Sequence, residues 1–208
     1  MGIDIWSFLA VTIPLVLTPG ASTAVVVRNS VVGGTRGGVE TAVGVNSGSV
    51  VYGLLAAFGL ALAIERWPLL WDVLRWAGTL YLAWLGVRAL YAAAHRTEPP
   101  QRSDGSRAPQ SPRRNLYEGL LTNLFNPAIA TFYLVLVPRF VPRGSPFARG
   151  VLLLTVVHVA IAFTCHVAWA IAGGAMSRAL TRGRGRLLLE LCSGVALIAL
   201  ALRMAFRS

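Results

Sequence analysis

Long apolar stretches without charged residues alternate along the chain with short polar segments rich in arginine. The two clearest stretches run from Ile5 to Val27 and from Gly119 to Pro138. About 20 apolar residues in a helix are enough to cross the hydrocarbon core of a bilayer. Six helical stretches are expected, at residues 3–27, 41–64, 68–91, 115–141, 150–177 and 187–206. The pattern predicts an all-α integral membrane protein with six transmembrane helices.

The third and sixth stretches differ from the others because they contain charged residues. These are Asp72, Arg75 and Arg88 in the third stretch, and Glu190 and Arg203 in the sixth. Asp72 and Arg75 are three residues apart and are expected to pair at the membrane interface, while the long arginine side chains can reach the interface from within a helix. Without these two stretches the count of transmembrane helices falls to four.

Prolines interrupt the first and fourth stretches near their middles. Pro127 follows Asn126, and its ring pushes against the carbonyl group of Asn123. Pro19 stands in the sequence Leu17-Thr18-Pro19-Gly20, where glycine lets the backbone bend at low cost. Matching interruptions in two halves of a chain are typical of transporters with internal repeats and a binding site at mid-membrane. The alternative is a pair of harmless kinks, which transmembrane helices tolerate.

A polar segment at residues 95–114 divides the chain. It is rich in proline, arginine, serine and glutamine and has few large apolar side chains, so it cannot bury enough surface to fold. We predict a flexible cytoplasmic linker at 95–114 between three-helix halves at 1–94 and 115–208. Because three is an odd number, the second half enters the membrane from the opposite side, which makes the predicted architecture a 3+3 inverted repeat with broken helices 1 and 4.

The distribution of arginine predicts the orientation in a plasma (inner) membrane. The segments after stretches one, three and five hold 2 + 6 + 4 = 12 arginines, and the other side holds 7. The side richer in arginine faces the cytoplasm, so both termini are expected outside.

Composition excludes several other classes of protein. The chain is 55% hydrophobic and 13% charged, and its net charge of +11 comes from arginines between or at the ends of the apolar stretches. That distribution signals topology and gives no basic patch for nucleic acid. No nucleotide-binding motif Gly-x-x-x-x-Gly-Lys-Ser/Thr is present. We expect no cofactor and no enzymatic activity. An ion gradient, most simply protons, is the expected energy source of a carrier of this kind.

A binding site is expected where the two interruptions meet. Thr18, Pro19 and Gly20 would face Asn123, Asn126 and Pro127, with helix-end amide groups for a carboxylate and freed carbonyl groups for an ammonium group. Gly44 and Gly48 are four residues apart, with Tyr52 one turn further, so another helix can pack closely there. This packing would bring the Asn46 amide and the Tyr52 hydroxyl towards the interruptions. The combination suits a zwitterionic amino acid.

Few ionisable residues are available to carry protons. His158 and His166 lie in the fifth stretch and are the candidates for proton coupling, because histidine changes its charge near neutral pH. Each is alternatively a hydrogen-bonded packing residue. Glu40 and Glu118 are expected at the membrane interface. No acidic residue except Glu190 is expected deep in a helix, which disfavours lysine or arginine as cargo.

The chain resembles the LysE/RhtB family of amino-acid exporters. The resemblance rests on Leu17-Thr18-Pro19-Gly20, on the glycine-rich run 33–48, on the sequence from Ala77 to Gly86, and on the run from Gly119 to Phe140. These motifs occur in order over nearly the whole chain. The resemblance implies six helices, export of amino acids or their derivatives from the cytoplasm, proton coupling and a homodimer.

Three positions depart from the pattern of that family. Ala21 stands where the family usually has proline, Ala128 where it usually has lysine, and Arg139 where it usually has glutamine. The chain contains no lysine at all. Any role that the lysine has in relatives is therefore vacant here or belongs to another residue.

Two other functions use the histidines and cysteines. A metal-ion exporter of a related six-helix fold would use His158, His166, Cys165 and Cys192, which are suitable soft and borderline ligands. Cys165 and His166 are adjacent, however, and point about 100° apart on a helix. A membrane thiol oxidoreductase would exchange electrons between Cys165 and Cys192, but the chain has no Cys-x-x-Cys motif. A membrane scaffold without transport activity is the remaining alternative.

Overall fold

The computed structural model describes residues 4–59, 68–94, 111–142 and 146–180, with several positions between 191 and 205. Every regular element in these ranges is helical, as the sequence predicted. The elements are α1 (Ile5–Leu17), α2 (Ala21–Ala57), α4 (Pro68–Ala94), α5 (Pro112–Leu124), α6 (Pro127–Thr131), the π-helix η1 (Phe132–Leu136), the 3₁₀-helix η2 (Val137–Phe140) and α7 (Phe147–Leu180). The described positions after 190 are also helical.

The predicted break in the first stretch is confirmed. The Asp4 side chain accepts a hydrogen bond of 3.1 Å from the Ser7 amide and so caps α1 at its start. Hydrogen bonds from the Ser7 hydroxyl and then from the Ser7 amide lower the pKa of this exposed carboxyl group. The helix ends before Thr18-Pro19-Gly20, because Pro19 has no amide hydrogen to continue the ladder. Helix α2 then begins at Ala21, and the two helices are bent by 45°.

The predicted loop between residues 27 and 41 is wrong, because nearly all of it is helical. Within α2 the backbone leaves helical geometry at Gly34, with φ 70° and ψ −178°, a conformation open almost only to glycine. The chain folds back there, since the Asn29 amide donates to the Thr41 hydroxyl at 2.9 Å and Val26 packs beside Ala42. Helix α2 is therefore a hairpin with a first arm before Gly34 and a second arm after it.

The predicted break at Pro127 is also confirmed. Helix α5 ends at Leu124, α6 begins at Pro127, and the two parts of this segment are bent by 56°. The segment continues as the π-helix η1 and the 3₁₀-helix η2. Such irregular helical turns often occur at functional sites.

Helix α7 is the one described helix that is long and apolar enough to cross a membrane unbroken, over Phe147–Met176. Each of the two bent segments passes the same test when its parts are taken together, Ile5–Leu17 with Ala21–Ala57 and Pro112–Leu124 with Pro127–Phe140. The described residues thus provide one to three candidate spans. The count of six and the inverted repeat remain predictions.

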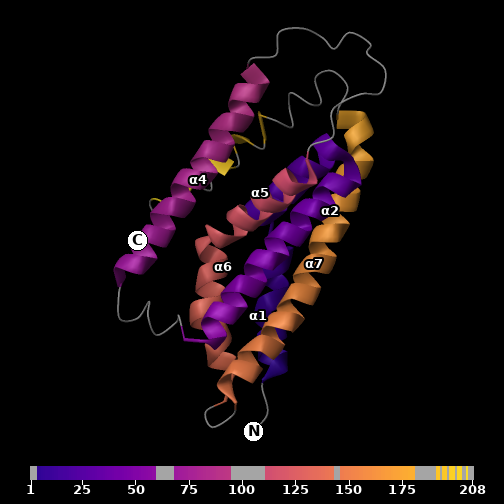
Figure 1. Ribbon diagram of the computed structural model, residues 1–208. Helices are drawn as coiled ribbons and strands as arrows, with labels where there is room; N and C mark the ends of the chain where they lie inside the picture. Colours follow the sequence, from indigo (N-terminus) through magenta and orange to yellow (C-terminus); the bar gives the residue numbers. More distant parts are fainter. Residues whose placement is uncertain are drawn as a thin grey trace.

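The second arm of α2 lies at the centre of the bundle, between α5 and α7 (Figure 1). It runs parallel to α5, and glycines bring the two backbones together as the spacing of Gly44 and Gly48 predicted. A Cβ atom at Gly44 would overlap the Leu116 carbonyl oxygen, and one at Gly119 would overlap the Thr41 carbonyl oxygen. Helix α7 runs antiparallel to the same arm, with Thr155 against Gly53 near one end and Gly174 against Thr35 near the other.

Helix α4 confirms the predicted third helix and lies on the far side of α5 and α6 (Figure 1). Its Leu82 and Leu85 pack with Val25 of α2 and Leu197 of the last stretch. Gly86 lies against Ile198, so the third and sixth stretches are neighbours. Outside the described residues lie 95–110 of the predicted linker and the charged residues Glu190 and Arg203. Helix α5 begins within the predicted linker, at Pro112.

Gly34→Ala is expected to destabilise the protein by about 1–3 kcal/mol, because alanine must adopt the same positive φ. A Cβ atom at Gly34 would meet nothing within 4 Å, so backbone strain alone causes the effect. Gly33→Ala is the matched control, because it also has open space and keeps helical backbone angles. Unfolding of both variants in detergent measures the difference. Equal stability of the two variants would contradict the hairpin at Gly34.

Candidate functional site

At the break between α5 and α6, protein groups replace the lost helical hydrogen bonds. The Asn126 side chain accepts from the Ala128 amide at 3.1 Å and caps α6. The Asn123 carbonyl group, which was expected to lose its partner, accepts instead from the Asn126 amide at 3.0 Å. The Leu124 carbonyl group accepts from the Tyr52 hydroxyl of α2. The predicted approach of Tyr52 to this break is thus confirmed, but Asn123 and Asn126 do not share one helix face, because the chain bends between them.

The break between α1 and α2 is more open. The Thr18 hydroxyl donates to the Pro14 carbonyl oxygen at 2.7 Å, and both Thr18 and Pro19 are exposed. Gly20 has no side chain to cap α2. Among the described residues, no hydrogen bond joins residues 18–20 to the second break. Helix α1 instead packs beside the segment that follows that break, with Phe8 against Phe132 and Phe140.

Buried polar side chains of α2, α5, η1 and α7 form a continuous cluster, which we call the polar file. Its members are Asn46, Ser49, Asn123, Tyr133, His158 and His166, and all of them are buried. Asn46 Nδ2 lies 3.2 Å from His166 Nδ1. Asn123 Nδ2 donates to Ser49 Oγ at 3.3 Å. Because Asn46 and Ser49 are three residues apart on one face of α2, the two contacts are neighbours.

Several polar atoms of the file accept or donate nothing within the described part of the chain. They include Asn46 Oδ1, Asn123 Oδ1 and His158 Nδ1. A buried polar group without a partner costs about 1–3 kcal/mol, and more is expected where no water is at hand. Such groups in an apolar bundle are typical of a place that receives a polar solute or water.

Aromatic rings form the other end of the polar file. The Tyr52 ring stacks on Tyr133 at 6.3 Å between centroids. The His158 ring contacts the rings of Phe132 and Tyr133, with centroids 4.6 Å and 5.3 Å away, respectively. Phe132 and Tyr133 belong to the π-helix η1, so the irregular turn after the second break positions the rings that contact His158.

The structure brings together four of the residues that the sequence singled out. Asn46, Asn123, His158 and His166 all belong to the polar file. Asn126 and Pro127 lie at the adjacent break, where Asn126 caps α6. Thr18, Pro19 and Gly20 lie at the separate, exposed break.

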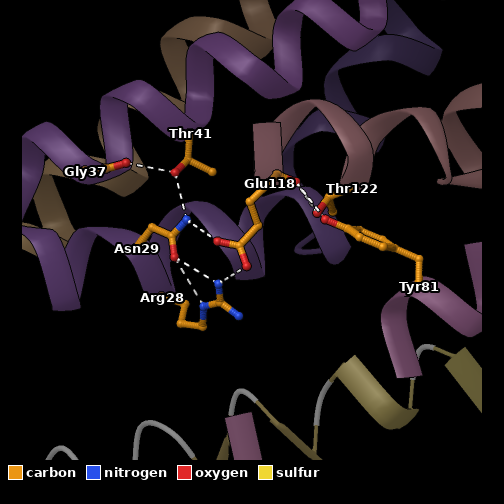
Figure 2. A network of polar contacts seen from close by, with 7 residues as sticks. All are labelled: Arg28, Asn29, Gly37, Thr41, Tyr81, Glu118 and Thr122. Atoms are coloured by element: carbon orange, nitrogen blue, oxygen red, sulfur yellow. Dashed lines mark hydrogen bonds and ion pairs between the residues drawn. The ribbon is translucent and has the colours of Figure 1, made fainter. Parts of the chain in front are cut away.

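Arg28 and Glu118 form a buried ion pair at the end of the bundle nearer the Gly34 turn (Figure 2). Asn29 joins both residues, because its Oδ1 accepts from Arg28 Nη2 at 3.1 Å and its Nδ2 donates to Glu118 Oε2 at 3.1 Å. The Glu118 carbonyl group also accepts from Thr122 Oγ1 at 2.6 Å and from Tyr81 OH at 3.4 Å. Four residues of α2, α4 and α5 therefore contact Glu118.

The structure adds the burial of both charges, which the sequence does not predict. Glu118, predicted at the membrane interface, has a side chain that is only 6% exposed, and its membrane depth stays a prediction. Arg28, counted with the segment after the first stretch and the helix end beside it, lies in the first arm of α2 and is 11% exposed. Without Arg28 the arginine counts become 12 − 1 = 11 against 7, so the predicted orientation is unchanged. Glu40 is only partly buried, and it bonds Asn115 at 2.9 Å and Arg36 at 3.0 Å.

A signal for this ion pair was present in the sequence. Arg28 directly follows the charge-free run that ends at Val27, and Glu118 directly precedes the run that begins at Gly119. The close packing predicted at Gly44 and Gly48 brings α2 and α5 together. Opposite charges at the ends of two such runs can therefore pair, provided that the helix continues past Val27.

The histidines and cysteines do not converge. Within the described ranges, no group of three His, Cys, Asp or Glu side chains is placed to hold a metal ion. Cys165 Sγ lies 3.8 Å from the Val16 carbonyl oxygen, and Cys165 and Cys192 are both free thiols. Nothing in this geometry favours the metal-exporter or thiol-oxidoreductase alternatives.

Comparison with known proteins is consistent with this helical, membrane-type architecture. The chain is 30% identical over 180 residues to the leucine efflux protein of Salmonella typhimurium strain LT2, covering 83% of this chain and 80% of that protein. It is 28% identical over 181 residues to the leucine efflux protein of Klebsiella pneumoniae, covering 87% and 84%. It is 24% identical over 152 residues to the uncharacterized membrane protein YrhP of Bacillus subtilis, covering 71% and 72%. No solved structure matches.

The family comparison covers almost the whole molecule. The sequence profile described as LysE type translocator matches residues 13–208, from the middle of α1 to the end of the chain. This range includes both helix breaks, the polar file and the Arg28–Glu118 pair. The chain belongs to the family of LysE-type translocators.

Proposed function

We propose that this protein exports amino acids or close derivatives from the cytoplasm across the cell membrane, using the proton gradient. Two relatives that align over more than four fifths of this chain are named leucine efflux proteins, which supports an amino acid as cargo. The observation that carries the proposal is the polar file, because unpaired amide oxygens inside an apolar bundle suit a polar solute.

The proposed central binding site lies between the polar file and the two helix breaks. Asn46 and Asn123 each offer an amide oxygen that can accept from an ammonium group. The first amides of α2, after Gly20, have no side-chain cap and would attract a carboxylate. Asn126 and Pro127 would border this site on one side, and Thr18 and Pro19 on the other.

Proton coupling is proposed for the two histidines of α7. His166 lies against Asn46, so a change in its charge would act directly on a proposed cargo ligand. His158 lies two turns away, beside Tyr133. The end of the bundle that holds Gly34 and the start of α5 would face the cytoplasm, in agreement with the excess of arginine there.

Replacement of Asn46 by leucine should lower efflux at least tenfold, because leucine has a similar size and cannot bond an ammonium group. The assay loads proteoliposomes with a mixture of amino acids that includes leucine, imposes an inward proton gradient and analyses the release by mass spectrometry. Ser47→Ala is the control, since this neighbouring hydroxyl bonds only its own helix at 2.9 Å. Undiminished efflux through Asn46→Leu would remove Asn46 from the site.

His166→Gln should abolish stimulation by the proton gradient and leave leucine counterflow within about twofold, because glutamine can still contact Asn46 but cannot carry a proton. His158→Gln is measured in parallel, and His95→Gln in the linker segment is the control. If both α7 variants respond to the gradient like the parent protein, neither histidine carries the coupling proton.

A further inference from the structure

A buried ion pair such as Arg28–Glu118 is rare in a bundle of membrane-spanning helices. Ser30, two residues after Arg28, packs against Gly173, and Gly38, three before Thr41, packs against Ala170. Both contacts lie towards the end of the apolar stretch Phe147–Met176 of α7, which is long and apolar enough to cross a membrane. Burying two opposite charges adds little to stability, and ionisable residues buried between membrane-spanning helices usually serve function.

We propose that Arg28 and Glu118 form the loading site for a zwitterionic amino acid, with Arg28 binding the cargo carboxylate and Glu118 binding the cargo ammonium group. The inference rests on the proposed function and names a site for it outside the polar file. A guanidinium group matches a carboxylate with two parallel hydrogen bonds. A carboxylate is in turn the natural partner of an ammonium group.

Exchange of partners keeps every charge paired. In the structure Arg28 and Glu118 neutralise each other, and a bound amino acid would bring one charge of each sign. The two protein charges can separate as the cargo charges replace them, so no buried charge is left without a partner. A buried charge without a partner would be strongly destabilising. A cargo with a further charge on its side chain would lack a partner for it.

The surroundings of the pair supply the remaining contacts. Asn29 already bonds both members and can follow either one. Asn115 is three residues before Glu118, on the same face of α5, and is 1% exposed. Its Nδ2 donates to Glu40, but its buried Oδ1 has no partner within the described part of the chain. This oxygen is available to a second hydrogen of the ammonium group.

The position of the pair fits a loading site. Thr41, which bonds Asn29, precedes Asn46 by five residues of one helix, a rise of about 7 Å. Cargo released from Arg28 and Glu118 would therefore reach the polar file in one short step. Glu118 also lies only six residues after the start of α5, and that start falls within the predicted cytoplasmic linker.

The test pairs two protein variants with two truncated ligands. Binding of labelled L-leucine to the purified full chain in detergent is competed with leucine, with 3-methylbutylamine, which lacks the carboxylate, and with 4-methylpentanoate, which lacks the ammonium group. In the parent protein each truncated ligand should bind at least tenfold more weakly than leucine. R28Q should bind 3-methylbutylamine as tightly as it binds leucine, because the partner of the ligand carboxylate is gone. E118Q should bind 4-methylpentanoate as tightly as it binds leucine, because the partner of the ligand ammonium group is gone.

If truncation of the ligand lowers affinity in the variants by the same factor as in the parent protein, the proposal is overturned. Absence of leucine binding to the folded parent protein would also overturn it. A purely structural ion pair would lower all affinities together without changing the ratios between ligands. If the glutamine variants do not fold, R28K and E118D keep the charges. R28K should then reduce the difference in affinity between leucine and 3-methylbutylamine, because the lysine ammonium group cannot form two parallel hydrogen bonds with a carboxylate. An unchanged difference counts against the proposal.

Transport separates this proposal from the proposed function. Leucine efflux by the parent with no ligand-specific change in R28Q or E118Q would refute the loading site alone. Ligand-specific changes in binding without any efflux would refute the export function alone.

Discussion

The close contact between α2 and α5 is the constraint on which the rest of the structure depends. Gly44 and Gly119 have no Cβ atom, so each lies directly against a backbone carbonyl group of the other helix. This approach allows Tyr52 to reach the carbonyl group freed at Leu124 and allows Asn123 to reach Ser49. The same contact places Glu118 beside Arg28. A larger residue at either glycine would separate the helices and leave these polar groups unpaired in an apolar bundle.

The sequence predicted those parts of the fold that follow from local chemistry. Charge-free runs gave the helices, Pro19 and Pro127 gave the two breaks, and the glycine spacing gave the packing face of α2. The sequence predicts that the chain reverses between the first two stretches, but polar residues there indicate a loop and not two helices that continue to Gly34. In the structure Asn29, Ser30 and Thr41 bond within the bundle, which lets the helices continue. The burial of Glu118 could not be predicted from local sequence either, since it depends on Arg28, a partner 90 positions away in the chain.

The structure shows where the alanine that replaces the family's usual lysine lies. Ala128 is the second residue of α6, and its amide bonds the Asn126 side chain. No lysine occurs in the chain to place a charge at that break. The charges that the described structure does bury belong instead to Arg28 and Glu118, at one end of the polar file. A neutral central site with a charged loading site would suit cargo that carries no net charge.

The most direct test of the account is whether the polar file lies on the path of the cargo. In a chain with Cys165 and Cys192 replaced by serine, Ser49→Cys places a thiol at the centre of the file, and Val50→Cys places one on the exposed apolar face of the same helix. Labelling with a small cationic thiosulfonate is measured in proteoliposomes with and without saturating leucine. The account predicts that leucine slows labelling at position 49 and leaves position 50 unchanged. Labelling at position 49 that does not respond to leucine, in proteoliposomes that transport leucine, would contradict it.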